Sequence, residues 1–212
     1  VRKIATDNNI VLIFDECTSG FRETFGGLHK KYGVDPDMAV FSKALGNGYA
    51  ISAVIGIQEV MEATQSTFIS STFWSGRIGP TAALKALEVM EREKSWEQIT
   101  STGKTIGNRW HALAEKHGLP IEISGLPALV NFNIPVDNWL KYKTLISQEM
   151  LKQGYLATNS VYVCIEHTDQ VVNAYFEKLD SVFSIIMDCE NGQDVDRLLE
   201  GPVCHAGFKR LN

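Results

Sequence analysis

The sequence is short of the features that point to membranes or nucleic acids. None of its apolar runs approaches the ~20 residues that a membrane-spanning helix needs. No segment is rich in lysine and arginine, and the net charge is −5 at pH 7. Both observations disfavour a nucleic-acid surface and a patch for anionic membranes. We therefore expect neither a nucleic-acid nor a membrane partner.

Cysteine is also scarce. The 212 residues include four cysteines, with no CxxC pair and no regular spacing between them, at Cys17, Cys164, Cys189 and Cys204. A zinc site or a disulfide frame would need such a pattern. A chain of this length can also bury a sizeable core without disulfides. The sequence therefore predicts reduced thiols, a cytoplasmic protein and no metal site.

What the sequence has instead is a series of apolar runs. Residues 10–15 (IVLIFD), 37–42 (DMAVFS) and 51–57 (ISAVIGI) are continuous apolar segments, which suit strands buried on both faces of a parallel sheet. A glycine-rich loop separates the first two runs. From Pro80 onward the apolar residues recur at helical spacing. This part of the chain predicts an α/β domain, a mostly parallel sheet with flanking helices.

The second half has a different pattern. Two short strands are predicted within residues 121–134, around a Gly-Leu-Pro turn. Strand and loop follow near residues 155–168, and Thr168 or Asp169 can cap the start of a helix. Helices are predicted over residues 96–118, where Gly118 suits the end of the helix, 136–154 and 170–187. The second half is therefore expected to be α+β.

The change from α/β to α+β predicts two domains. We place the boundary near residue 115, which gives a first domain over residues 1–115 and a small α+β domain over residues 116–212. The part after about residue 186 is expected to form a tail. No repeat or low-complexity segment is visible.

A single lysine, Lys43, follows the second apolar run and precedes a glycine-rich turn, where either phosphate binding or Schiff-base formation would use it. A phosphate-binding P-loop requires serine or threonine after its lysine, and Lys43 is followed by Ala44. Gly103-Lys104-Thr105 matches the end of that motif, but Gln98 stands at its first glycine. The segment also lies within a helical pattern, so a solvated helix face is the better interpretation there.

Asp15 supports the Schiff-base interpretation of Lys43. It ends the first apolar run 28 residues before Lys43, so the two side chains can lie at the same edge of a parallel sheet. A desolvated lysine amine reacts with carbonyl groups, and a carboxylate can hold a pyridine nitrogen protonated. Two simpler interpretations remain: a loop lysine, and a turn cap formed by Asp15 or Glu16. For Glu16 we keep the turn cap.

These residues carry a resemblance to a known family. The stretch LIFDECTSGFR…FGG…YGVDPDMAVFSKALGNGYAISAVIG resembles the class III pyridoxal-phosphate aminotransferases of fold type I, and most of all the branch that contains glutamate-1-semialdehyde aminomutase. The likeness extends from residue 1 to about residue 186. It implies that residues 1–115 are the carboxy-terminal part of a cofactor-binding large domain.

The resemblance also implies roles for individual residues. Asp15 would pair with the pyridine nitrogen of pyridoxal phosphate, and Cys17 would pack on the face of the ring. Lys43 would form the covalent imine with the cofactor. Thr72 would reach the phosphate of the neighbouring subunit, which implies a homodimer. The expected reaction transfers an amino group from a small-molecule amino donor to a carbonyl acceptor, or within one molecule.

Three departures from the family pattern accompany the resemblance. Ser19 stands where the family usually has threonine. Pro80 lies eight residues after Thr72, and Arg77 occupies the register expected for proline, which puts the phosphate contact in question. The family's phosphate-binding glycine/serine loop would precede residue 1, so we expect this chain to be a fragment of the enzyme. The alternative is a non-catalytic fragment or degenerate homologue that acts through its dimer surface.

Overall fold

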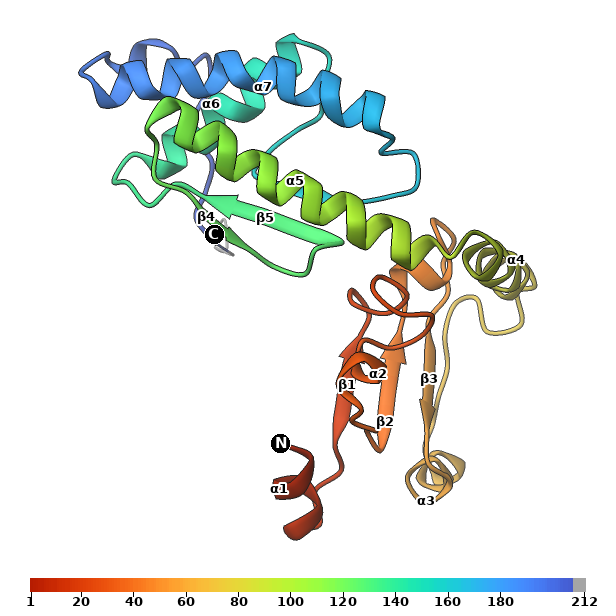
Figure 1. The fold of residues 1–212 in the computed structure, drawn as a ribbon. Helices are drawn as coiled ribbons and strands as arrows, with labels where there is room; N and C mark the ends of the chain where they lie inside the picture. Colours follow the sequence, from red (N-terminus) through yellow and green to blue (C-terminus); the bar gives the residue numbers. More distant parts are fainter. Residues whose placement is uncertain (208–212) are drawn as a thin grey trace. The chain divides into compact units, whose positions relative to one another are not determined.

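The computed structural model of the protein describes residues 1–207. Its internal contacts divide the chain into two compact units, Val1–Ile99 and Thr100 onward (Figure 1). The division falls within helix α5, Ser95–His117, and the boundary predicted near residue 115 lies at the other end of that helix. Among the described residues, no helix is long and apolar enough to cross a membrane.

The first unit contains a three-stranded sheet in the order β1-β2-β3 (Figure 1). Strands β1 (Ile13–Glu16) and β2 (Met38–Phe41) are parallel, whereas β3 (Ala53–Gly56) is antiparallel to β2. All three lie within the predicted apolar runs, apart from the last residue of β1. Residues 42–52 join β2 to β3, and this connection is shorter than the crossover of about a dozen or more residues that a parallel partner needs.

The remaining elements of the first unit are short helices, with one exception. The packed core of this unit includes Ala39 and Phe41 of β2 and Ala83 of helix α4. The helices are α1 (Arg2–Asp7), α2 (His29–Tyr32), η1 (Lys43–Leu45), α3 (Gln58–Met61), η2 (Glu62–Ser66) and α4 (Ile78–Glu93).

The two faces of this sheet differ in burial. Glu16 and Phe41 are opposite each other in the ladder and are buried, as expected for one packed face. On the alternate face, Ile13 is 53% and Val54 47% exposed. The prediction of strands buried on both faces is therefore wrong, because the described packing covers mainly one of them. Successive residues of a strand point to opposite faces, so Asp15 shares the open face with Ile13.

The second unit is α+β, as the sequence predicts. It has a sheet in the order β4-β5-β6 with antiparallel pairing throughout. Gly118 ends α5 with a positive φ of 69°, and the Thr168 side chain accepts a hydrogen bond from the Val171 N–H at the start of α7. The elements after α5 are β4 (Glu122–Ser124), β5 (Leu129–Asn133), α6 (Trp139–Lys152), β6 (Ser160–Tyr162), α7 (Asp169–Glu190) and η3 (Val195–Arg197).

Phe132 of β5 lies at the centre of the core of this unit. It is fully buried, and its ring centroid is 4.7 Å from that of Trp110 on α5 and 6.0 Å from those of Trp139 and Phe183. One side chain of the sheet therefore contacts α5, α6 and α7. Helices α6 and α7 run alongside each other (Figure 1). This aromatic centre ties all three long helices to the sheet.

The tail predicted after residue 186 begins later, because α7 continues to Glu190. The following segment lies along α6, where side chains about two turns apart hold it. Lys141 pairs with Asp196, with 2.6 Å between Nζ and Oδ2. The Gln148 amide donates to the Leu198 carbonyl at 2.8 Å. The tail is thus part of the second unit as far as the structure describes it.

Candidate active site

The predicted pair Asp15 and Lys43 lies at the carboxyl ends of two adjacent parallel strands. Asp15 is the third residue of β1, and Lys43 is the second residue after β2. Because β1 and β2 are paired in parallel, their carboxyl ends lie at the same edge of the sheet. The expected juxtaposition of the two chemical groups is present in the backbone.

Lys43 has an unusual backbone conformation. Its φ is +41°, in the left-handed region that a non-glycine side chain rarely adopts. Such conformations cost free energy and are concentrated at functional sites. The side chain is exposed, and its Nζ donates a hydrogen bond of 2.5 Å to Oγ1 of Thr18. The desolvation that the sequence analysis invoked for this lysine is not supplied by the described residues.

The Asp15 carboxylate is held by the residue that the resemblance places on the cofactor ring. The Cys17 N–H donates to Oδ1 of Asp15 at 3.0 Å. This bond, a second one with the Cys17 side chain and the nearby Lys43 charge lower the pKa of Asp15, so the group is an anion at neutral pH. The hydrogen bond between the Cys17 side chain and Asp15 raises the pKa of the Cys17 thiol, which keeps it neutral.

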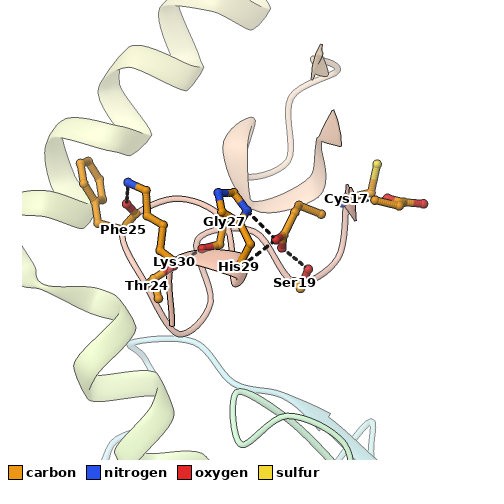
Figure 2. A network of polar contacts seen from close by, with 9 residues as sticks. Cys17, Ser19, Thr24, Phe25, Gly27, His29 and Lys30 are labelled. Carbon is orange, nitrogen blue, oxygen red and sulfur yellow. Dashed lines mark hydrogen bonds and ion pairs between the residues drawn. The ribbon is translucent and has the colours of Figure 1, made fainter. Parts of the chain in front are cut away.

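Glu16 points away from Asp15 and anchors the loop that follows β1. It is 4% exposed and accepts hydrogen bonds from the His29 N–H and from His29 Nδ1, both at 3.1 Å, and from the Ser19 hydroxyl. Figure 2 shows Ser19 and His29 directed toward this carboxylate. The turn cap kept for Glu16 in the sequence analysis accounts for only part of these contacts. The hydroxyl of Ser19 supplies the contact, so the change from the family's threonine keeps the donor.

A second carboxylate fixes the far side of the same loop, residues 17–28. Glu23 pairs with Lys31 on α2, with 2.5 Å between Oε2 and Nζ. Phe25 packs against Trp96 with ring centroids 5.3 Å apart. The loop is therefore held at both ends: Ser19 binds Glu16 of β1, and Glu23 pairs with Lys31 of α2.

The glycines after Lys43 were expected to let the backbone approach a flat cofactor. At Gly46 the structure offers a different reason. A Cβ atom on this residue would lie 2.2 Å from the carbonyl oxygen of Tyr49, so the turn itself requires glycine.

Thr72 and Arg77 belong to a different segment of the first unit. Both are exposed, in the segment between η2 and α4. Among the described residues, no hydrogen bond or ion pair of Asp15, Cys17 or Lys43 involves Thr72. The structure thus brings together three of the four predicted site residues, and the role of Thr72 toward a neighbouring subunit stays a prediction.

The P-loop alternative has no support. Lys104 lies within α5 and is exposed. Gly103 has a packing role instead, because a Cβ atom there would lie 1.8 Å from the Pro127 carbonyl oxygen. Among residues 1–207, no group of His, Cys, Asp and Glu side chains is arranged to hold a metal ion.

Sequence reasoning missed Thr18 and His29. Thr18 contacts Lys43 across 25 positions, and His29 contacts Glu16 across 13. No periodicity in the sequence signals either contact. The only signal for Thr18 was its place two residues after a strand end, which mirrors the place of Lys43 after β2.

Comparison with known proteins places the fold first. The structure matches the PLP internal aldimine form of the FumI protein of Sphingopyxis sp. MTA144 with a TM-score of 0.84 and 22% identity, over 93% of this chain and 48% of that one. It matches an omega-transaminase from Sphaerobacter thermophilus with a TM-score of 0.77 and 20% identity, over 86% and 46%. The chain thus has part of the fold of these fold-type-I enzymes, as predicted.

The sequence comparison then gives the family. The model of the class III aminotransferases matches residues 1–176, and the chain belongs to this family. It is 35% identical to a 3-aminobutyryl-CoA aminotransferase from Cloacimonas acidaminovorans, over 80% of this chain and 42% of that protein. It is 28% identical to glutamate-1-semialdehyde 2,1-aminomutase from Methanocaldococcus jannaschii, over 86% and 47%. The chain spans about half the length of these curated relatives.

Pyridoxal phosphate is the cofactor that this family assignment indicates, as the sequence predicted. The groups at the strand ends fit it. The cofactor offers an aldehyde and a basic pyridine nitrogen, and the site offers the Lys43 amine and the anionic Asp15 carboxylate. Cys17, a neutral thiol beside Asp15, is small enough to leave space for a flat ring.

Proposed function

We propose that the protein carries the catalytic lysine of a pyridoxal-phosphate-dependent aminotransferase or aminomutase. One observation supports this most: a lysine and an anionic aspartate lie at the adjoining ends of parallel strands in a chain of the class III family. The substrates would be a small-molecule amino donor and a carbonyl acceptor. The four cysteines are free, and we keep the cytoplasm as the proposed location.

The chain's own residues have distinct parts in this proposal. When bound, the cofactor supplies an electron-withdrawing ring and an aldehyde. Lys43 would hold the aldehyde group through its Nζ amine and, when that amine is free, would act as the base and acid that moves a proton. Asp15 would keep a proton on the pyridine nitrogen, since its lowered pKa leaves it as the charged carboxylate that such a bond requires. Cys17 would support the ring from one face.

A homodimer is part of the proposal. The segment that carries Thr72 also exposes large apolar side chains: Phe68 is 95%, Phe73 65% and Trp74 70% exposed. Exposed apolar patches of this kind are typical of protein–protein interfaces. A neighbouring subunit on this segment would cover the apolar surface and bring Thr72 to the partner's cofactor phosphate.

The test is to trap the cofactor on its lysine. Treating the protein with pyridoxal phosphate and borohydride should leave a reduced pyridoxyl group on Lys43, located by mass mapping of peptides. Lys43→Arg should abolish the label, because a guanidinium stays charged and is not a nucleophile. Lys104→Arg, a matched change on α5, should leave the label in place. A label on Lys30, Lys31 or Lys104 in the unchanged protein would contradict the assignment.

A second variant separates the proposal from a non-catalytic role. Asp15→Asn should still bind the cofactor covalently but lose proton transfer in the enzyme, because a neutral amide cannot stabilise the pyridinium charge. The alternative, a fragment that acts only through its surface, predicts no visible absorbance from bound cofactor in any variant. Since the chain spans about half of its relatives, we expect cofactor binding by these residues alone to be weak.

A further inference from the structure

Thr18 is the hydrogen-bond partner of the Lys43 amine. Its hydroxyl oxygen accepts a hydrogen bond from Nζ at 2.5 Å. Thr18 is the second residue after β1 and Lys43 the second after β2, so the bond joins equivalent positions beyond two parallel strands. Thr18 itself belongs to the loop that Ser19 joins to Glu16 of β1 and that Glu23 joins to α2. The acceptor is therefore on a fixed part of the chain.

The alternative partner for Lys43 is Asp15. Its charge is close enough to contribute to the lowered pKa of Asp15. Yet within the described residues no ion pair of 4.0 Å or less joins Nζ to the Asp15 carboxylate. Both side chains are exposed and carry opposite charges, so a weak ion pair between them is the competing arrangement. Such a pair would occupy the amine and the carboxylate at the same time.

We propose that Thr18 is a positioning residue that keeps the Lys43 amine apart from the Asp15 carboxylate when no cofactor is bound. This inference rests on the function proposed for Lys43. It gives Thr18 a role that a packing residue would not have: the hydroxyl, and not the size of the side chain, sets the availability of the amine. Valine has nearly the shape of threonine without the hydroxyl, and serine has the hydroxyl without the methyl group.

The test measures the Lys43 amine itself, without the cofactor. Reductive methylation with formaldehyde and a borohydride converts each free amine at a rate that mass mapping follows for every lysine. In Thr18→Val, the released amine pairs with Asp15, and the Lys43 rate should fall about two- to fivefold, the range expected of an exposed ion pair. Thr18→Ser should keep the rate of the unchanged protein.

A double variant identifies the cause. Thr18→Val combined with Asp15→Asn removes the carboxylate, so the Lys43 rate should recover. Lys31, which is paired with Glu23 beside the same loop, shows through an unchanged rate that the loop stays folded. An unchanged or raised Lys43 rate in Thr18→Val, an equal fall in Thr18→Ser, or no recovery in the double variant would each overturn the inference.

The methylation test of Thr18 and the labelling test of the proposed function can fail independently. If pyridoxal phosphate labels Lys43 in the unchanged protein while methylation is insensitive to Thr18, only the role of Thr18 fails. If methylation responds as expected but pyridoxal phosphate labels another lysine, the proposed function fails and the contact remains a structural one.

Discussion

The two units of the protein differ in what they bury. The largest fully buried side chains among the described residues, such as Trp110, Phe132 and Phe183, all lie in the second unit. The first unit holds the proposed catalytic pair. It also contains most of the large apolar residues that are exposed, with Phe68 at 95% and Trp74 at 70%. Packing and chemistry are therefore concentrated in different parts of the chain.

The difference shows how a site can be ordered without a deep core. In the first unit, a buried carboxylate with several hydrogen bonds fixes the loop beside the site. Burial alone would raise the pKa of Glu16, but hydrogen bonds from Ser19, the Leu28 N–H and His29 outweigh it and lower the pKa. In the second unit, apolar and aromatic contacts centred on Phe132 hold the elements together instead. Substitutions in the two units should therefore have different signatures.

The largest expected effect is in the second unit. Phe132→Ala should lower the free energy of unfolding by about 3–5 kcal/mol, because it opens a cavity among the rings of Trp110, Trp139 and Phe183. The matched change in the first unit, Phe25→Ala, should cost less than about 3 kcal/mol, since that ring is only half-buried. Urea unfolding of both variants measures the two costs. Equal costs would remove the distinction between the units.

The next effect is electrostatic and belongs to the first unit. Glu16→Gln should lower the free energy of unfolding at pH 7 by about 1–3 kcal/mol, because the hydrogen bonds of Ser19 and His29 lose their charged acceptor. The pKa of Glu16 is lower in the folded chain than its unfolded value of about 4.3. Its stabilisation is therefore fully present above that value and disappears as the pH falls through the folded pKa.

The measurement is a series of urea unfolding curves between pH 7 and pH 3. The difference between the unchanged protein and Glu16→Gln should shrink as the pH falls, since the native group then becomes neutral as well. Glu91→Gln, an exposed position on α4, serves as the control and should shift stability by less than about 0.5 kcal/mol at any of these values. A constant difference for Glu16→Gln across the series would mean that its charge contributes nothing.

The part of the site that could be predicted depends on strand order alone. The apolar runs located β1 and β2, and the rule that parallel strands end at one edge brought Asp15 and Lys43 together. Unlike this pair, the contacts of Thr18 and His29 depend on the path of the loop over residues 17–28. That path is set by long-range packing, which leaves no periodic signal in the sequence.

The burial of the first sheet could not be read from its composition either. A continuous apolar run predicts a strand and says that its side chains favour apolar surroundings, but it does not say which described element covers them. Ile13 and Val54 share the face that remains half exposed. In the second unit, the strands predicted within residues 121–134 and the helices predicted over residues 136–154 and 170–187 are present, and β5 buries alternate residues, Val130 and Phe132. There the pattern and the observed burial agree.

The tail extends the comparison to polar contacts within the second unit. One face of α6 carries four side chains that each contact the segment from η3 onward: Lys141, Thr144, Gln148 and Lys152. Gln148 makes two of these contacts, since its amide donates to the Leu198 carbonyl and its oxygen accepts from the Glu200 N–H, both at 2.8 Å. Lys141 makes one, with the largely exposed Asp196.

The smallest predicted effects distinguish these two kinds of contact. Gln148→Ala should lower the free energy of unfolding by about 1–2 kcal/mol, because two backbone groups of the tail lose a partner that is itself partly buried. Lys141→Ala should lower it by less than about 1 kcal/mol, since water and salt screen an exposed ion pair. Raising the salt concentration should erase the Lys141 effect and leave that of Gln148. Neither change should alter the labelling of Lys43 by pyridoxal phosphate, because both lie outside the first unit. If Gln148→Ala costs no more than Lys141→Ala, the tail rests on α6 without being held by these hydrogen bonds.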